Sequence, residues 1–191
     1  MHRLAAALIA AALAIAGVLV FAGAGRGGGA AAVVDVGAVP AVIPASAGFR
    51  AQVVRVVDGD TLIGRIDGRG PPLRVRIIGA DTPETVKPGV AVRCYGPQAS
   101  AFTKHLLRPG TWVEAAYEGG DPTDRYGRQL WDVWLPDGRF LEAVLVASGA
   151  ARAYPFAPQL DHADLLADLQ RQAQAAHRGL WGPPCNGNSF S

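Results

Sequence analysis

This chain of 191 residues has few cysteines, few lysines and a small net charge. Two cysteines exclude a disulfide-dense miniature fold and a four-cysteine zinc site. Eighteen basic residues against 16 acidic ones leave a net charge of +2, which excludes the coating of nucleic acid through a strong overall positive field. Of the basic residues 16 are arginines, the side chain best suited to bidentate phosphate contacts. Composition alone does not decide the class of function.

The sequence signatures of several enzyme classes are also missing. The chain has no G-x-S-x-G nucleophile elbow, no H-E-x-x-H, no C-x-x-C and no Walker phosphate loop. These absences exclude the α/β-hydrolase, metalloprotease, dithiol redox and P-loop classes. Three histidines each stand alone on an expected helix, and we interpret them as incidental: His105, His162 and His177.

The N-terminal segment has the pattern of an export signal. A short positive start precedes the apolar run Leu4–Phe21, and small residues follow at 22–24, where a signal peptidase would cut. The same run is just long enough to cross a bilayer. Residues 1–24 are therefore predicted to be either a cleaved signal peptide or an anchor in the cytoplasmic membrane. In both cases the rest of the chain is expected to be extracytoplasmic, with residues 25–49 as a flexible Gly/Ala-rich linker.

From residue 50 the pattern of apolar and polar residues is typical of a packed domain with short strands. Apolar alternation and Gly/Pro turns predict five strands, at 52–57, 61–66, 73–77, 111–117 and 129–135. One helix is expected between Pro97 and the Pro109-Gly110 stop, and two more at 141–148 and 160–178. The apolar stripe of the last helix is expected to be Leu165, Leu169, Ala173 and Ala176.

This order of elements predicts the fold class. Five strands with a helix between the third and the fourth is the order of an OB-type barrel. We therefore predict an α+β fold, mainly β, in which a five-stranded OB-type barrel carries about three helices. The four tryptophans are most simply core residues, and the alternative is a platform on which bases stack: Trp112, Trp131, Trp134 and Trp181.

Three polar turns carry the residues that could bind a metal or take part in a reaction, at 58–61, 81–84 and 124–128. Taken singly, each is typical of a structural turn. Together they supply carboxylate oxygens for a hard cation, a carboxylate base and, with Arg76 on a neighbouring strand, cationic groups for phosphate. Metal-assisted phosphodiester hydrolysis requires this set, and no other constellation in the sequence provides it.

Four motifs follow one another in a specific order and spacing. They are V-D-G-D-T (57–61), R-I-I-G-A-D-T-P-E-T (76–85), C-Y-G-P-Q-A-S-A-F-T-K (94–104) and T-D-R-Y-G-R (123–128). This series resembles the staphylococcal nuclease, or thermonuclease, family. The likeness continues through 142–154 to G-L-W at 179–181, so it covers residues 50–182 and leaves 183–191 as a C-terminal tail. The resemblance implies a calcium-dependent endonuclease that cleaves DNA, RNA or both by metal-assisted water attack and leaves 3′-phosphate ends.

The resemblance also implies the role of each acidic residue. Asp60 and Asp81 would bind Ca²⁺ together with the backbone carbonyl of Thr82, and Asp58 would lie just behind these ligands. Glu84 would act as the general base for the attacking water.

Arginines and tyrosines complete the implied site. Arg76 and Arg128 would bind the phosphate and stabilise the charge that develops on it, so both count as catalytic. Tyr126 and Tyr154 would line the substrate site.

The sequence departs from the family pattern at several positions. Phe156 stands where the type member has a second tyrosine, and the loop 86–93 carries only Lys87 and Arg93 as cations. The type member has no cysteine. Because an exported domain meets oxidising conditions, we expect a disulfide between Cys94 and Cys185 that holds the C-terminal tail against the barrel.

A non-catalytic OB-type module that binds nucleic acid is the alternative function. Such a module would have lost part of the catalytic set, whereas all five members are present: Asp60, Arg76, Asp81, Glu84 and Arg128. The sequence therefore favours the enzyme, acting as a monomer on a nucleic-acid substrate without a protein partner. It leaves open the preference for DNA or RNA, the balance of internal and terminal cleavage, and whether Leu4–Phe21 tethers the chain to a membrane.

Overall fold

The computed structural model describes residues 48–85, 89–117, 122–154 and 162–190. The predicted export segment and nearly all of the predicted linker lie outside these residues, as do Lys87 and Phe156. Among the helices described, none is both long enough and apolar enough to cross a membrane.

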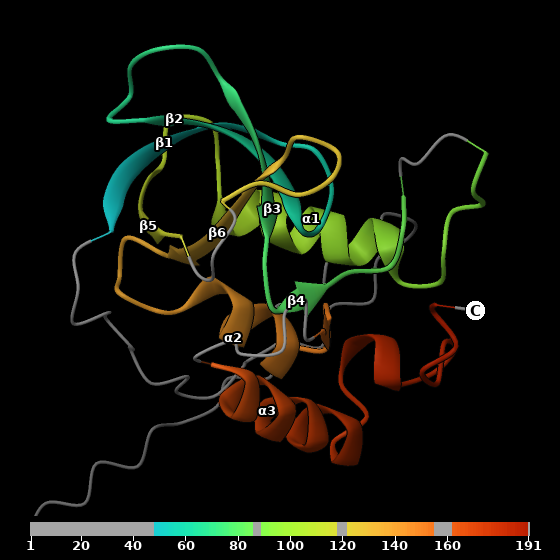
Figure 1. Cartoon of the computed structure of the whole chain (residues 1–191). Coiled ribbons are helices and arrows are strands. Elements are labelled where there is room, and N and C mark those ends of the chain that lie inside the picture. The colour runs from blue at the N-terminus through green and yellow to red at the C-terminus, as the bar shows by residue number, and fades with distance from the viewer. Residues whose placement is uncertain (1–47, 86–88, 118–121, 155–161, 191) are drawn as a thin grey trace, which may run out of the picture. The chain divides into compact units, whose positions relative to one another are not determined.

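Five strands close into a barrel, in the order β1-β2-β3-β6-β5 with β5 pairing back to β1 (Figure 1). They are β1 (Phe49–Val56), β2 (Thr61–Ile66), β3 (Leu73–Ile77), β5 (Trp112–Ala116) and β6 (Gln129–Trp134). Neighbours run antiparallel except β3 and β6, which pair in parallel. This topology confirms the predicted OB-type barrel.

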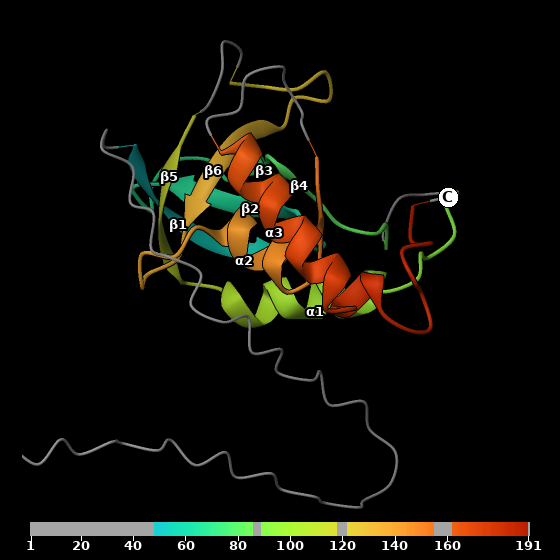
Figure 2. The same ribbon diagram turned by 90° about the horizontal axis from the view of Figure 1, so that it is seen from below.

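In the part of the chain that the structure describes, three α-helices accompany the barrel, as predicted: α1 (Gly96–Leu106), α2 (Leu141–Ala147) and α3 (Ala163–Ala175). Helix α2 packs between β6 and α3, so α3 forms an outer layer on that side (Figure 2). A single 3₁₀ turn, η1 (Gly179–Trp181), follows α3.

The apolar stripe predicted for α3 is partly wrong. Leu169 and Ala173 are buried, but the third buried residue is Leu166, whereas Leu165 is half-buried and Ala176 is exposed. Ala176 lies at the C-terminal cap, where the helix ends and the chain turns away, so it no longer continues the buried face.

Two of the four tryptophans are core residues as expected. Trp131 and Trp134 are buried inside the hydrophobic core. Trp181 is half-buried, and Trp112 is 37% exposed with the guanidinium of Arg50 stacked 4.8 Å from its ring centroid. The core prediction is therefore wrong for Trp112, because it points outward from a strand whose alternate residues, Val113 and Ala115, face the core.

A short two-stranded sheet that the sequence did not predict lies beside the barrel. Strand β4 (Ala80–Asp81) pairs antiparallel with β7 (Arg152–Ala153), and Asp81 is the register partner of Arg152. This pairing joins the segment after β3 to the segment after α2.

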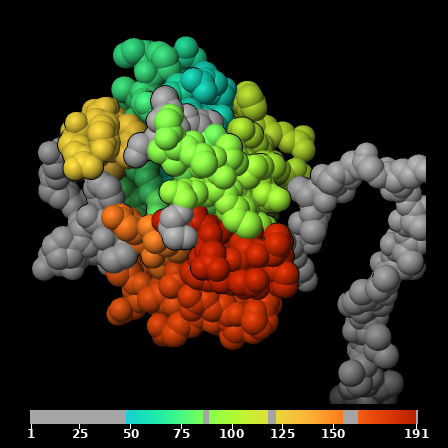
Figure 3. Space-filling model, turned by 90° about the vertical axis from the view of Figure 1, so that its right-hand side faces the viewer, coloured from blue at the N-terminus to red at the C-terminus, as the bar shows by residue number. Residues whose placement is uncertain are grey.

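The two cysteines form a disulfide, as expected. Cys94 lies just before α1, Cys185 lies after η1, and their Cα atoms are 5.7 Å apart. The segment around α1 and the C-terminal segment accordingly lie side by side on the face seen in Figure 3. The bond attaches the tail at Cys94, directly after Arg93. The amide of Arg93 donates to the carbonyl of Glu84, so this attachment point is also tied to the segment that carries Glu84.

Candidate active site

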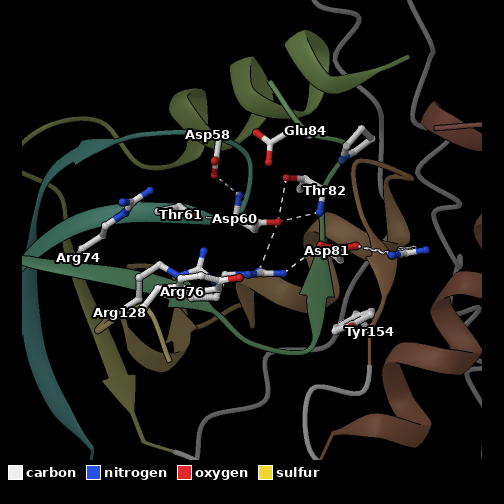
Figure 4. Close-up of a pocket in the computed structure, with 13 residues that line it drawn as sticks. Asp58, Asp60, Thr61, Arg74, Arg76, Asp81, Thr82, Glu84, Arg128 and Tyr154 are labelled. Atoms are coloured by element: carbon white, nitrogen blue, oxygen red, sulfur yellow. Dashed lines mark hydrogen bonds and ion pairs between the residues drawn. The ribbon is translucent and has the colours of Figure 1, made fainter. Parts of the chain in front are cut away.

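A cleft of about 540 Å³ opens where the β1–β2 turn, β3, β4 and the segment before β6 meet (Figure 4). All nine residues that the sequence predicted for the catalytic, metal and substrate site line this cleft. Its lining includes four carboxylates and four arginines. The carboxylates are Asp58, Asp60, Asp81 and Glu84, and the arginines are Arg74, Arg76, Arg128 and Arg152.

Asp60 is the central and best-fixed carboxylate of the cleft. Its Oδ2 accepts hydrogen bonds from the amide and the hydroxyl of Thr82, at 2.8 and 3.0 Å, and its Oδ1 accepts one from the Thr61 hydroxyl at 3.2 Å. Asp60 and Thr82 are both buried. Because these bonds join the turn after β1 to the turn after β4, they hold the two predicted metal-binding segments together.

The turn that carries Asp60 is fixed by close packing and by α1. A Cβ atom at Gly59 would lie within 2.6 Å of the Thr82 side chain, so only glycine allows this approach. The buried hydroxyl of Thr103 on α1 donates to the Gly59 carbonyl at 2.8 Å. Helix α1 therefore positions the turn, although it contributes no side chain to the cleft.

Arg76 lies on the opposite side of Asp60 from Asp58 and Glu84 (Figure 4). Only 6% of Arg76 is exposed. Its Nη1 is 3.3 Å from Asp60 Oδ2 and donates to the Ala80 carbonyl at 2.7 Å, and its Nη2 donates to Asp81 Oδ1 at 3.1 Å. The guanidinium is thus held rigidly between both predicted metal ligands.

Asp81 contacts two arginines, one through each carboxylate oxygen. Oδ1 accepts from Arg76, and Oδ2 accepts from Arg152 Nε at 2.9 Å and forms an ion pair with Arg152 Nη2 at 2.8 Å. Burial raises the pKa of Asp81, as does the negative charge of Asp60, while the two guanidiniums oppose this increase. The orientation of Asp81 is therefore set by cations on both sides.

Asp58 and Glu84 lie together on the α1 side of the cleft (Figure 4). Asp58 Oδ1 accepts from the Asp60 amide at 3.2 Å. Burial raises the pKa of Asp58 to about 6, and the charge of nearby Asp60 adds to the increase. Glu84 is half-buried, and its Oε1 accepts from the amide of Thr85 at 2.9 Å.

Arg128 is held at the cleft by Asp124, a partner that sequence analysis did not identify. Its Nε donates to Asp124 Oδ2 at 2.7 Å, and its amide donates to Oδ1 at 2.9 Å. Burial raises the pKa of Asp124, but hydrogen bonds from Arg128 and from the Tyr126 amide outweigh it, so the pKa lies below its ordinary value. The Tyr126 ring is 67% exposed and stacks 4.9 Å from the guanidinium of Arg125 and 5.6 Å from that of Arg128.

Comparison with known proteins agrees with this geometry. A family profile described as staphylococcal nuclease homologue matches residues 74–183. The thermonucleases of Staphylococcus intermedius and Staphylococcus hyicus are 45% and 42% identical to this chain over 130 and 131 residues, which cover 68% of this chain and 74% of each relative. The endonuclease YncB of Bacillus subtilis is 34% identical over 128 residues, 66% of this chain and 59% of the relative. The chain belongs to the staphylococcal nuclease family.

The donor set of the cleft fits the metal that the staphylococcal nuclease family implies. Within the described ranges, no three side chains of Asp, Glu, His or Cys form a metal cage by themselves. The predicted site has two carboxylates, of Asp60 and Asp81, and one backbone carbonyl, of Thr82, all hard oxygen donors suited to Ca²⁺. The raised pKa values of Asp58 and Asp81 mean that negative charge accumulates there at a cost, which a bound cation would relieve.

Two cleft arginines were missed by the sequence reasoning. Arg74 precedes Arg76 by two residues on β3, so the period of a strand was a usable signal that both face the same side. Arg152 gave no such signal, because its contact with Asp81 spans 71 positions and depends on the unpredicted pairing of β4 with β7.

Proposed function

We propose that this chain is an exported, calcium-dependent endonuclease that hydrolyses DNA, RNA or both and leaves 3′-phosphate ends. The general activity, hydrolysis of phosphodiester bonds by a nuclease, is supported by the family assignment and by thermonuclease and endonuclease relatives. The observation that carries the detailed proposal is the convergence of Asp60, Asp81 and Glu84 with Arg76 and Arg128 in one cleft.

The carboxylates of this cleft would bind the cation and move the proton. Asp60, Asp81 and the Thr82 carbonyl would hold Ca²⁺, which supplies positive charge next to the phosphodiester when it is bound. The carboxylate of Glu84 would accept the proton of the attacking water. Few protein ligands leave room for water and for a phosphate oxygen in the coordination shell of Ca²⁺.

The arginines would bind the phosphate and stabilise the charge that develops during the reaction. Arg76 and Arg128 reach the cleft from β3 and from the segment before β6, so the phosphate would lie between two guanidiniums. The planar fork of arginine matches two phosphate oxygens, which a lysine would match less well. Each is already oriented by carboxylates, so little side-chain freedom is lost when substrate binds.

Export is the part of the proposal that rests on the N-terminal sequence and on the disulfide rather than on the cleft. The apolar run Leu4–Phe21 supports it, as does the disulfide, a bond that persists in oxidising compartments. N-terminal sequencing of the protein recovered from membranes and from the medium tests it. Recovery in the medium with a new N-terminus near residue 24 indicates a cleaved signal, an intact chain in the membrane indicates an anchor, and an intact chain in the cytosol contradicts export.

The activity is tested with the purified full chain on single-stranded DNA, duplex DNA and RNA, with Ca²⁺ or with a chelator. We expect cleavage only with Ca²⁺ and products that accept a 5′-label but need phosphatase before their 3′ ends can be extended. The Arg128→Ala variant serves as the control for contaminating nuclease. Binding without cleavage in Ca²⁺ would contradict the proposal and favour a non-catalytic binding module.

A further inference from the structure

Arg152 is held in the cleft by two aromatic rings that belong to different parts of the chain. Its guanidinium carbon lies 3.9 Å from the ring centroid of Phe190 and 5.4 Å from that of Tyr154. Tyr154 follows β7 directly, whereas Phe190 belongs to the C-terminal tail, which the disulfide of Cys185 fastens to the domain. The tail is therefore packed against a residue of the cleft.

The contact continues from Arg152 to a predicted ligand of the metal. Nε of Arg152 donates to Oδ2 of Asp81 and its Nη2 forms an ion pair with the same oxygen, while Oδ1 accepts from Arg76. Phe190, Arg152 and Asp81 thus form a continuous series from the tail to the predicted metal site. Arg152 engages one of the two oxygens that a cation would otherwise reach.

A guanidinium in this place has two opposing effects on cation binding. It orients the carboxylate of Asp81, which favours binding, and it adds a positive charge beside the cation, which opposes binding. The orienting effect is small here, because Arg76 and the backbone pairing of β4 with β7 fix Asp81 independently. The charge effect is larger, because Arg152 lies in direct contact with Asp81 and the cation carries two charges.

We propose that Arg152, held in place by Phe190 of the disulfide-bonded tail, limits the affinity of the metal site for Ca²⁺. This inference rests on the proposed function, since it assigns a regulator to that metal site. Arg152 acts on the site through its positive charge beside Asp81, and the tail holds that charge in place.

Calorimetric titration of the full chain with Ca²⁺ alone, in the absence of substrate, tests the proposal. We expect the Arg152→Gln variant to bind Ca²⁺ about tenfold more tightly than the wild type. The Phe190→Ala variant keeps the charge but releases the guanidinium, so we expect about a twofold to threefold gain in affinity. A gain of affinity cannot arise from misfolding.

The matched control is Arg50→Gln, which removes the same charge. Arg50 also stacks on an aromatic ring, that of Trp112, and pairs with Glu114 at 3.4 Å, but it does not line the cleft. We expect its Ca²⁺ affinity to match that of the wild type. Unchanged or weaker binding by a natively melting Arg152→Gln variant would overturn the role of Arg152, and an unaltered Phe190→Ala variant would overturn the role of the tail. A wild type that binds no Ca²⁺ would instead overturn the proposed function itself.

Discussion

At the residue scale, the charged groups of the cleft are fixed by one another before any substrate arrives. Asp60 is bonded to Thr82 and Thr61, and Arg76 lies between Asp60 and Asp81. Preorganised charges of this kind stabilise a transition state without the cost of reorganisation during the reaction. Removal of one of these residues is therefore expected to change both the rate of cleavage and the free energy of unfolding, and the balance of the two effects should differ between residues.

The two arginines proposed to bind the phosphate should differ in their effect on stability. Arg76→Ala and Arg128→Ala should each lower kcat/KM by a factor of about 10²–10³, the loss typical of one removed donor to a developing anion. Arg76 is buried between two carboxylates, so its removal should also lower the free energy of unfolding by about 3 kcal/mol in the absence of Ca²⁺. Arg128 is partly exposed, and two backbone amides still donate to Asp124 when its side chain is removed, so its variant should lose clearly less stability than Arg76→Ala. Equal stability of the two variants would contradict this assignment.

The ion pair of Asp124 with Arg128 should stabilise the fold by an amount that depends on pH. The pKa of Asp124 is lowered in the folded state, so its ionisation contributes stability above about pH 4, and the contribution is lost as pH falls through the lowered pKa. Asp124→Asn should therefore be less stable than the wild type at pH 7, and the difference should shrink below pH 4. Urea unfolding of both proteins across this range measures it, and a difference that does not vary with pH would contradict the ion pair.

At the scale of elements, strands with strong alternation were predictable and the short pairings were not. The predicted strands at 61–66 and 73–77 have the bounds of β2 and β3, and the other three barrel strands differ from prediction by one to three residues at an end. Strands β4 and β7 have two residues each, which is too short for an alternation of apolar and polar residues to be recognised in the sequence. Their pairing depends on the folded barrel, and for that reason Arg152 could not be placed beside Asp81 in advance.

Helix α1 should act on the metal site through a single hydrogen bond. Thr103→Val keeps the side-chain volume but leaves the buried Gly59 carbonyl without the hydroxyl that donates to it, so stability should fall by about 1–2 kcal/mol. Because that turn carries Asp60, Ca²⁺ affinity should fall as well. Thr103→Ser restores a hydroxyl and should recover most of the affinity. Calorimetry on both variants tests this, and a Thr103→Val protein with normal Ca²⁺ binding would show that α1 does not position the turn.

At the scale of the whole molecule, the site could be predicted because its residues come in short motifs of fixed spacing. Nine predicted side chains converge in one cleft, although they derive from four separated segments of the chain. The contribution of the C-terminal tail had no such signal. Phe190 is an isolated aromatic residue near the end of the sequence, and only the packing of the tail brings it to Arg152.

The disulfide should contribute substantially to the stability of the whole domain. It joins residues that are 91 positions apart, and in the chain-entropy model closure of such a loop stabilises a protein by about 4–5 kcal/mol. The double variant Cys94→Ser, Cys185→Ser should therefore unfold at a lower urea concentration, by about that free energy. If the oxidised wild type and the double variant unfolded with the same free energy, the disulfide would contribute nothing to the stability of the domain.

The central claim is that one cleft both binds Ca²⁺ and cleaves nucleic acid, and Asp60→Asn tests it most directly. Asn keeps the size of the side chain and can still accept hydrogen bonds from Thr82, while the negative charge is lost. Calorimetric Ca²⁺ binding and cleavage of single-stranded DNA are measured on the same samples, together with the melting temperature. We predict that the wild type binds Ca²⁺ and cleaves, and that the natively folded variant loses both. A variant that still binds Ca²⁺ and cleaves at the wild-type rate would contradict the account.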